Sequence, residues 1–113
     1  MRTAWLLRDG QVLASLDVAD HPMDRMRGLI GRSGFEGAIL LPHTRAVHTM
    51  FMRFPLDVAF VRRDLTVGAI VTMPRWRLGV PRRGCRSVLE ASAGAFERWG
   101  LRVGDRLEIR DAG

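Results

Sequence analysis

Four short apolar segments follow one another between residues 37 and 73, and this succession limits the folds open to the chain. Runs of apolar and β-branched residues separated by turn signals are typical of strands. The predicted strands lie near residues 37–41, 46–53, 57–63 and 66–73. No helical crossover fits between them, so consecutive strands should pair antiparallel. The sequence therefore predicts a mainly β fold, either a compact antiparallel barrel or a sandwich.

The segments on either side agree with this fold class. Residues 3–8 and 11–17 are rich in apolar residues and flank Asp9-Gly10, a pair that suits the tight turn of a β-hairpin. Two further strands are predicted near the C-terminus, at residues 87–91 and 106–110. The last of them alternates apolar and charged residues, as a half-buried strand does.

One or two short helices interrupt the strands. Beginning at His21, apolar residues recur at three- and four-residue spacing, and Gly31 can end that helix. A second helical turn carries Phe96, is predicted to be capped by Ser92, and ends at Gly100.

The chain has the size and composition of one globular domain. It contains 113 residues, of which 47% are hydrophobic and 27% charged, so we expect a single β-rich domain over residues 1–113. Cys85 is the only cysteine, which excludes an intrachain disulfide and a cysteine-cluster metal site. The first apolar run is cut at Arg8, too early for the core of a signal peptide. We therefore expect a cytoplasmic protein with no membrane span.

The net charge of +6 is carried by arginine alone, because the sequence contains no lysine. A basic chain favours anionic partners, but clustered charge is more informative than net charge. Residues 74–86 contain five arginines and no acidic residue, broken up by prolines and glycines. We predict an anion-binding loop here, formed by Arg75, Trp76, Arg77, Arg82 and Arg83. Weak attraction to polyanions is expected from it, and specific nucleic-acid binding is not.

Four sequence blocks resemble one known family, that of domain of unknown function 192, whose members are small prokaryotic proteins. The blocks are "RMRGLIGR" at 25–32, "TMFMRFPLDVAFV" at 49–61, "SVLEASAG" at 87–94 and "GLRVGDRLEI" at 100–109. The resemblance covers most of the chain between Arg25 and Ile109.

The resemblance implies a compact, mainly antiparallel β-barrel or sandwich, in agreement with the predicted strands. It implies no activity, because none is established for the family. In the family pattern an asparagine follows the basic residue of the second block, whereas this chain has Phe54 after Arg53. A role for that amide is therefore not expected here.

His48, Met50 and Met52 would share one face of the predicted strand at 46–53, because side chains alternate across a strand. One imidazole and two thioethers are a sensible ligand set for Cu(I). Methionine is also a common filler of irregular cores, and no carboxylate or further histidine lies close by to complete a site. We therefore expect core packing and no bound metal or other cofactor, with soft-metal binding as an alternative.

Two carboxylates fall within predicted apolar strands, where burial is costly unless they are paired or hydrogen-bonded. Asp57 either fastens a turn after Phe54-Pro55 or faces a pocket together with Arg27. Glu90 poses the same choice. Together with His48, these residues define the predicted binding pocket: Arg27, His48, Asp57 and Glu90. A buried ion network of Arg27, Asp57 and Glu90 that only fixes the helix to the sheet is the structural alternative.

The function predicted from these features is a small binding module with a polar pocket and a basic loop for an anionic or polar partner. An enzyme acting on a small polar or sugar-like substrate, with Asp57 or Glu90 as general base, is the main alternative. The sequence lacks the surroundings of a nucleophile elbow and a glycine-rich phosphate loop, so catalysis is not favoured.

Overall fold

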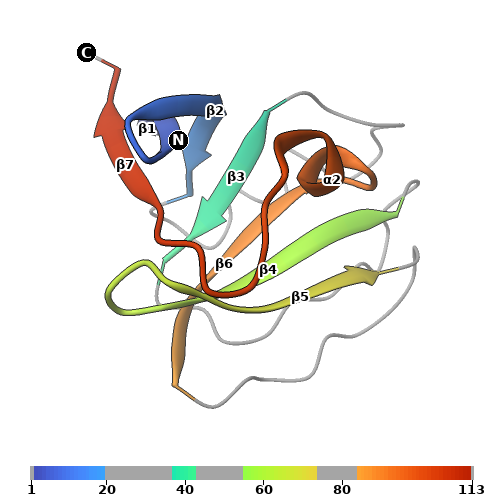
Figure 1. Cartoon of the computed structure of the whole chain (residues 1–113). Coiled ribbons are helices and arrows are strands. Elements are labelled where there is room, and N and C mark those ends of the chain that lie inside the picture. Colours follow the sequence, from blue (N-terminus) through green and yellow to red (C-terminus); the bar gives the residue numbers. More distant parts are fainter. Residues whose placement is uncertain (1, 20–36, 43–54, 74–83, 113) are drawn as a thin grey trace.

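The computed structural model describes residues 2–19, 37–42, 55–73 and 84–112. These segments form one sheet and a short helix (Figure 1). The elements are β1 (Arg2–Arg8), β2 (Gln11–Val18), β3 (Ala38–Leu41), β4 (Leu56–Arg62), β5 (Val67–Met73), β6 (Cys85–Ser92), α2 (Ala95–Trp99) and β7 (Glu108–Asp111). The mainly β fold class predicted from the sequence is thus confirmed.

The sheet has seven strands in the order β5-β4-β6-β3-β2-β1-β7. Five of its six pairings are antiparallel, and the exception is the parallel pair of β2 with β3. The sheet is therefore mixed. β4 and β5 pair antiparallel, as expected of consecutive strands between residues 37 and 73, whereas the parallel pair joins β3 to β2, which lies outside that region. Residues 19–37 separate β2 from β3, and a connection of that length allows a parallel return.

Two tight turns, one of them the predicted Asp9-Gly10 turn, depend on backbone conformations that few residues adopt. Asp9 and Gly10 join β1 to β2 with φ angles of 52° and 78°. Positive φ at both central residues matches the twist of a two-residue hairpin. Between β4 and β5, Leu65 has φ 70°, and the amide of Thr66 donates a 3.0 Å hydrogen bond to Oδ1 of Asp64. These short links explain why the hairpin partners were predictable from the sequence.

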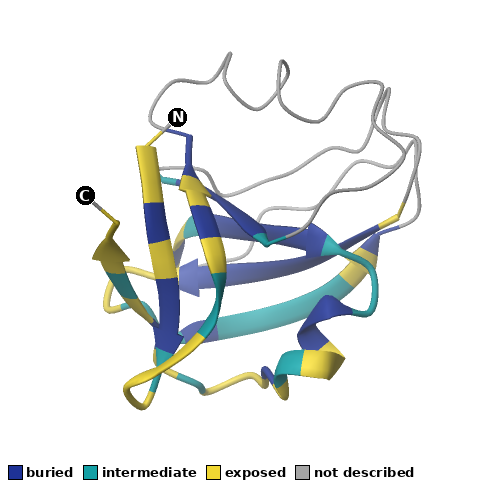
Figure 2. Ribbon diagram, turned by 90° about the horizontal axis from the view of Figure 1, so that it is seen from above, coloured by how far each residue is buried: buried dark blue, intermediate teal, exposed yellow. Residues whose placement is uncertain are grey.

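The two faces of the sheet bury separate apolar clusters. We call the side on which α2 lies the helix-side face, and its cluster includes Ala59, Leu89 and Phe96. The other side is the far face, where Val58, Phe60 and Val88 belong to a second cluster. Neighbours along β4 and β6 alternate between the clusters, as the two-residue period of a strand requires. Figure 2 shows α2 over one side of the buried central strands.

Backbone hydrogen bonds connect the beginning of β5 to the segment that leads into β7. The amide of Val67 donates to the carbonyl of Asp105 at 2.8 Å, and the amide of Gly104 donates to the carbonyl of Val67 at 2.8 Å. Leu107 likewise donates to Leu65, at 2.9 Å. These hydrogen bonds connect the two outer strands of the sheet, β5 and β7, at one point, through the segment that leads into β7. Closure into a complete barrel stays a prediction.

The predictions for the helices and for the strand at 46–53 have different outcomes. The helix after His21 and the strand at 46–53 lie outside the described residues. The Ser92 cap was wrong, because β6 continues through Ser92 and the N-cap of α2 is Gly94. Gly100 does end the helix, with φ 66°. In the described part of the chain, no helix is long and apolar enough to cross a membrane.

Candidate functional site

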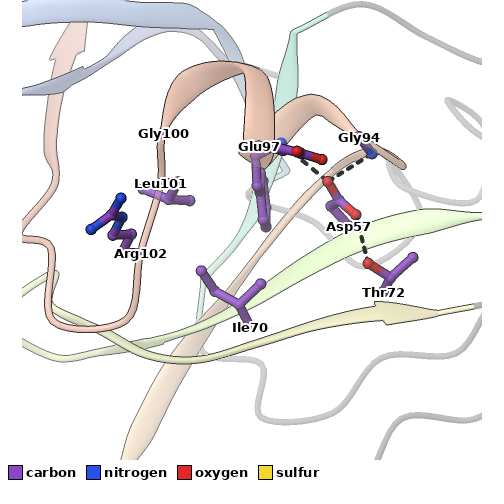
Figure 3. A pocket seen from close by; sticks show the side chains of 9 residues that line it. Asp57, Ile70, Thr72, Gly94, Glu97, Gly100, Leu101 and Arg102 are labelled. Carbon is purple, nitrogen blue, oxygen red and sulfur yellow. Dashed lines mark hydrogen bonds between the residues drawn. The ribbon is translucent and has the colours of Figure 1, made fainter.

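Asp57 is held by three hydrogen bonds, one from β5 and two from the beginning of α2 (Figure 3). Its Oδ1 accepts a 2.9 Å bond from the hydroxyl of Thr72 on β5. Its Oδ2 accepts bonds from the amides of Gly94, at 2.9 Å, and Phe96, at 3.1 Å. Asp57 is only 5% exposed. Its cost of burial is therefore offset by donors that the fold itself supplies.

The two amide bonds show what Asp57 does for the helix. The first N–H groups of a helix have no partner within it, and a side chain at the N-cap usually satisfies one of them. Here the N-cap is Gly94, which has no side chain. Asp57 reaches over from β4 and accepts from the N-cap and from Phe96, the second helical residue. The carboxylate thus acts as a tertiary cap, and its negative charge also suits the positive end of the helix.

A surface pocket of about 430 Å³ lies beside this cap, between β5 and α2. Apolar side chains of Ile70, Phe96 and Leu101 form part of its lining, and the Thr72 hydroxyl contributes a polar group. The remaining lining residues are Asp57, Gly94, Glu97, Gly100 and Arg102. Figure 3 shows Ile70 and Leu101 between the Asp57 cap and Arg102. The pocket therefore combines an apolar floor with polar groups around it.

Glu90 lies on the other side of the sheet from Asp57. It is fully buried, and its direct neighbours across the two ladders are Val58 and Ile39, both in the cluster of the far face. The neighbours of Asp57 are Ala91 and Thr72, and Ala91 belongs to the helix-side cluster. Directly opposed residues share a face, so the two carboxylates point away from each other. The structure does not bring Asp57 and Glu90 into one pocket or one ion network.

The other predicted site residues lie outside the described part of the chain. They are Arg27, His48, the soft-metal candidates Met50 and Met52, and the predicted anion-binding loop of Arg75, Trp76, Arg77, Arg82 and Arg83. Their roles stay predictions. Among the described residues, no group of three or more histidine, cysteine, aspartate and glutamate side chains is placed to hold a metal ion.

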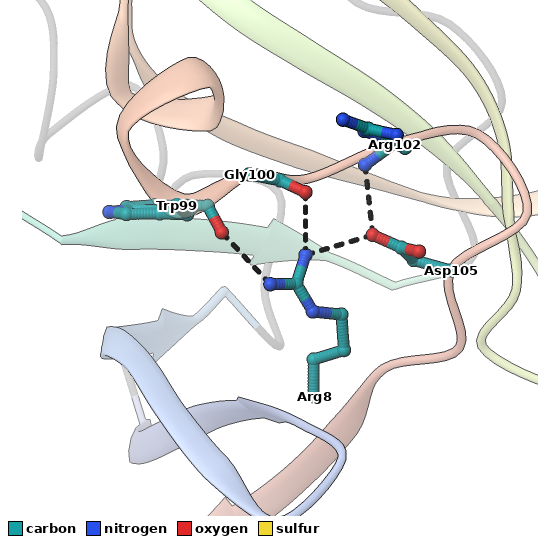
Figure 4. A network of polar contacts seen from close by, with 5 residues as sticks. All are labelled: Arg8, Trp99, Gly100, Arg102 and Asp105. Atoms are coloured by element: carbon teal, nitrogen blue, oxygen red, sulfur yellow. Dashed lines mark hydrogen bonds and ion pairs between the residues drawn. The ribbon is translucent and has the colours of Figure 1, made fainter.

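A second polar network, which sequence reasoning missed, holds the other end of α2 (Figure 4). The guanidinium of Arg8 donates to the carbonyls of Trp99 at 3.0 Å and Gly100 at 2.8 Å, and to Oδ2 of Asp105 at 2.9 Å. The amide of Arg102 donates to the same Asp105 oxygen, at 2.9 Å. A cation that binds the last carbonyls of a helix complements the negative end of its dipole. Nothing local in the sequence links Arg8 to residues so far along the chain.

Asp105 is stabilised in its charged form by this network. The amide of Arg102 contributes most to lowering the pKa of the Asp105 carboxyl below its ordinary value of 3.8, and Arg8 adds to the effect. A carboxyl whose pKa is lower in the folded state stabilises the fold above its unfolded pKa. That contribution is lost as the pH falls through the lower, folded value.

Replacing Asp105 with asparagine should therefore reduce stability at neutral pH and have less effect in acid. We expect the gap in unfolding free energy between the wild type and Asp105→Asn to narrow steadily below about pH 4. Urea unfolding of both proteins at a series of pH values measures this gap. A gap that stays constant down to about pH 2 would show that the charge of Asp105 contributes nothing to stability.

Comparisons with known proteins agree with the resemblance carried by the four sequence blocks. The family model of domain of unknown function 192, described as an uncharacterized ACR, matches residues 5–109. A UPF0127 protein of Pyrococcus furiosus is 35% identical over 95 residues, covering 80% of this chain and 82% of that protein. A UPF0127 protein of Pyrococcus abyssi is 31% identical over 98 residues, covering 82% and 84%.

Two solved structures share the fold. A proposed transcription regulator from Sinorhizobium meliloti superposes with a TM-score of 0.75 and 27% identity, over 96% of this chain and 92% of that one. A protein of unknown function from Novosphingobium aromaticivorans gives a TM-score of 0.73 and 22% identity, over 94% and 83%. Since the family model spans nearly the whole chain, this protein belongs to the uncharacterised prokaryotic family of domain of unknown function 192, whose members include the UPF0127 proteins.

Proposed function

We propose that this chain is a small binding module whose ligand site is the pocket between β5 and α2. The observation that supports this most directly is the composition of the pocket. Its volume of about 430 Å³ falls within the roughly 300–1,000 Å³ of ligand sites. An apolar floor of Ile70, Phe96 and Leu101 beside a few polar groups is also the usual make-up of such sites.

Two observations favour binding over catalysis at this pocket. Asp57, the carboxylate nearest to a ligand, already accepts three hydrogen bonds from the protein and is almost fully buried. A general base must come within hydrogen-bond reach of the proton that it removes. Glu90, the other candidate base, faces the opposite side of the sheet. Both acids of the enzyme hypothesis are thus poorly placed to serve this pocket.

The predicted anion-binding loop supplies a second candidate function, in which the chain binds polyanions. The net charge of +6 and the five arginines of residues 74–86 favour it. The description of the Sinorhizobium meliloti relative as a proposed transcription regulator points in the same direction, toward nucleic acid. We rank it second, because the residues of that loop lie outside the described part of the chain whereas the pocket lies within it.

Filling the pocket should abolish binding. We expect a library of small polar and amide-containing fragments, screened by NMR, to shift the amide signals of pocket residues such as Gly94, Gly100 and Leu101. Ile70→Trp places a large ring in the pocket and should remove those shifts. Val12→Trp adds the same ring at an exposed position on β2 and should leave them unchanged. Shifts that persist in Ile70→Trp, or no shifts at the pocket in the wild type, would contradict the proposal.

A further inference from the structure

The backbone of β5 has an edge that faces away from β4. The direction of the backbone N–H and C=O groups along β4 tells which groups of β5 point outward. The carbonyl of Pro55, just before β4, points toward β6, because it accepts a 3.2 Å hydrogen bond from the amide of Ala93, just beyond β6. Backbone groups alternate sides along a strand, so Asp57 and Ala59 also bond toward β6, and Val58 and Phe60 bond toward β5.

The partners of those two residues on β5 are Val71 and Ala69, which therefore direct their backbone groups toward β4. The intervening residues, Ile70 and Thr72, must direct their N–H and C=O groups outward. Among the described residues, no backbone bond from another segment reaches these outward groups. Ile70 and Thr72 also contribute side chains to the pocket. This backbone edge, unpaired within the described part of the chain, and the pocket therefore lie side by side.

Among the described residues, this edge has a bulge at Gly68 but lacks the charged and proline residues that usually protect a sheet edge. Natural edge strands commonly carry charged residues or proline that prevent pairing with other chains. The other outer strand, β7, reads Glu-Ile-Arg-Asp, whereas β5 reads Val-Gly-Ala-Ile-Val-Thr-Met and has neither a charge nor a proline. At its first residue the edge already pairs with another segment, since Val67 exchanges backbone bonds with Gly104 and Asp105. Beyond Val67, the edge is thus free of charged residues that would oppose pairing, and no described segment pairs with it.

We infer that the pocket and the β5 edge together bind an extended peptide segment of a partner protein, which adds as a strand alongside β5. The inference rests on the proposed function and names its ligand class. Strand addition gains affinity from main-chain bonds and specificity from pockets for alternate side chains. Outward groups of Ile70 and Thr72 would supply the bonds, and the apolar floor would take one apolar side chain of the peptide.

The net charge of the chain favours an acidic peptide. The pocket lining itself contains two acids, Asp57 and Glu97, beside Arg102, so it has no excess of positive charge. Arg98 and Arg102 are both exposed near α2, and neither guanidinium is in an ion pair with a described residue. The chain as a whole carries a net charge of +6, which attracts acidic partners. The expected ligand is therefore an extended segment with an apolar residue flanked by Asp or Glu.

A matched pair of variants at Thr72 tests the strand addition. Thr72→Pro removes the outward N–H, and proline is tolerated where the N–H of an edge strand faces solvent. Thr72→Val keeps the N–H and the branched shape but, like the proline variant, loses the hydroxyl that bonds Asp57. Ten-residue peptides selected from a phage-displayed library against the wild type serve as probes, and fluorescence anisotropy gives their affinity. We expect Thr72→Pro to weaken binding about tenfold or more relative to Thr72→Val.

Amide hydrogen exchange of the wild type provides a measurement that does not depend on the variants. Bound peptide should slow exchange at Ile70 and Thr72, the two outward amides, more than at any other β5 residue. Equal affinity of the two variants, unchanged exchange at these amides, or the absence of selected peptides would each overturn the inference. Fragment binding at the pocket would in those cases leave the proposed function standing. Analytical ultracentrifugation tests a second copy of the chain as the partner. If the wild type self-associates and Thr72→Pro does not, the edge binds another copy of the chain and the peptide inference is overturned.

Discussion

Replacing Asp57 with alanine should lower the free energy of unfolding by about 2–3 kcal/mol, because it strands donors that the fold has buried. The amides of Gly94 and Phe96 would both lose their acceptor, and α2 would lose its cap. The two effects act on the same helix end, so their costs overlap rather than add. Equilibrium unfolding in urea measures the change.

Two further variants separate the contributions of the three bonds. Thr72→Val removes only the hydroxyl bond and should cost about 1 kcal/mol, since the rest of the cap remains. Asp57→Asn keeps an acceptor oxygen without the charge, so its loss of stability should lie between those of Thr72→Val and Asp57→Ala. If the free energy of unfolding of Asp57→Ala lies within about 0.5 kcal/mol of the wild-type value, the carboxylate does not anchor the helix. Asp57 would then become available to a ligand, and the catalytic alternative would regain weight.

Replacing Arg8 with methionine should cost about 2 kcal/mol, the second largest effect that we expect. The substitution keeps an unbranched side chain but removes three hydrogen bonds, to Trp99, Gly100 and Asp105. The side chains of Arg8 and Asp105 are 22% and 26% exposed, so water weakens their ion pair and the helix carbonyls account for much of the effect.

The geometry of the guanidinium makes lysine an informative control at this position. An ammonium group carries the same charge but lacks the planar fork that reaches three acceptors at once. We therefore expect Arg8→Lys to recover only part of the lost stability in the same urea measurement. Full recovery would show that the charge of Arg8 matters and its hydrogen-bond geometry does not.

Local patterns were enough to predict much of the fold. The hairpin of β1 and β2 is encoded by apolar-rich runs on either side of Asp9-Gly10, and β4 to β6 by short apolar runs. The parallel pairing of β2 with β3 was not predictable in the same way, because it joins strands separated by a long connection. The strand propensity of a residue depends on its neighbours within a few positions, whereas the order of strands in a sheet depends on contacts across the whole chain.

The candidate site shows the same division. The cost of burying a carboxylate singled out Asp57 from the sequence, and the structure supplies the donors that offset this cost. Those donors come from β5 and from the beginning of α2, so their identity required the tertiary structure. The predicted pocket placed Asp57 and Glu90 together, whereas they face opposite sides of the sheet. Alternation tells which residues of one strand share a face, but the relative faces of β4 and β6 depend on their register.

The attachment of α2 at both ends has a consequence for how the chain folds. An isolated helix of five residues is too short to persist in water, so α2 must gain its stability from contacts with the sheet. One anchor comes from β1 and the other from β4, two strands on different sides of the strand order. The helix is therefore stable only as part of a cooperative unit with these strands. A chain that lacks the first strand retains the sequence of the helix but loses one of the two anchors that hold it in place.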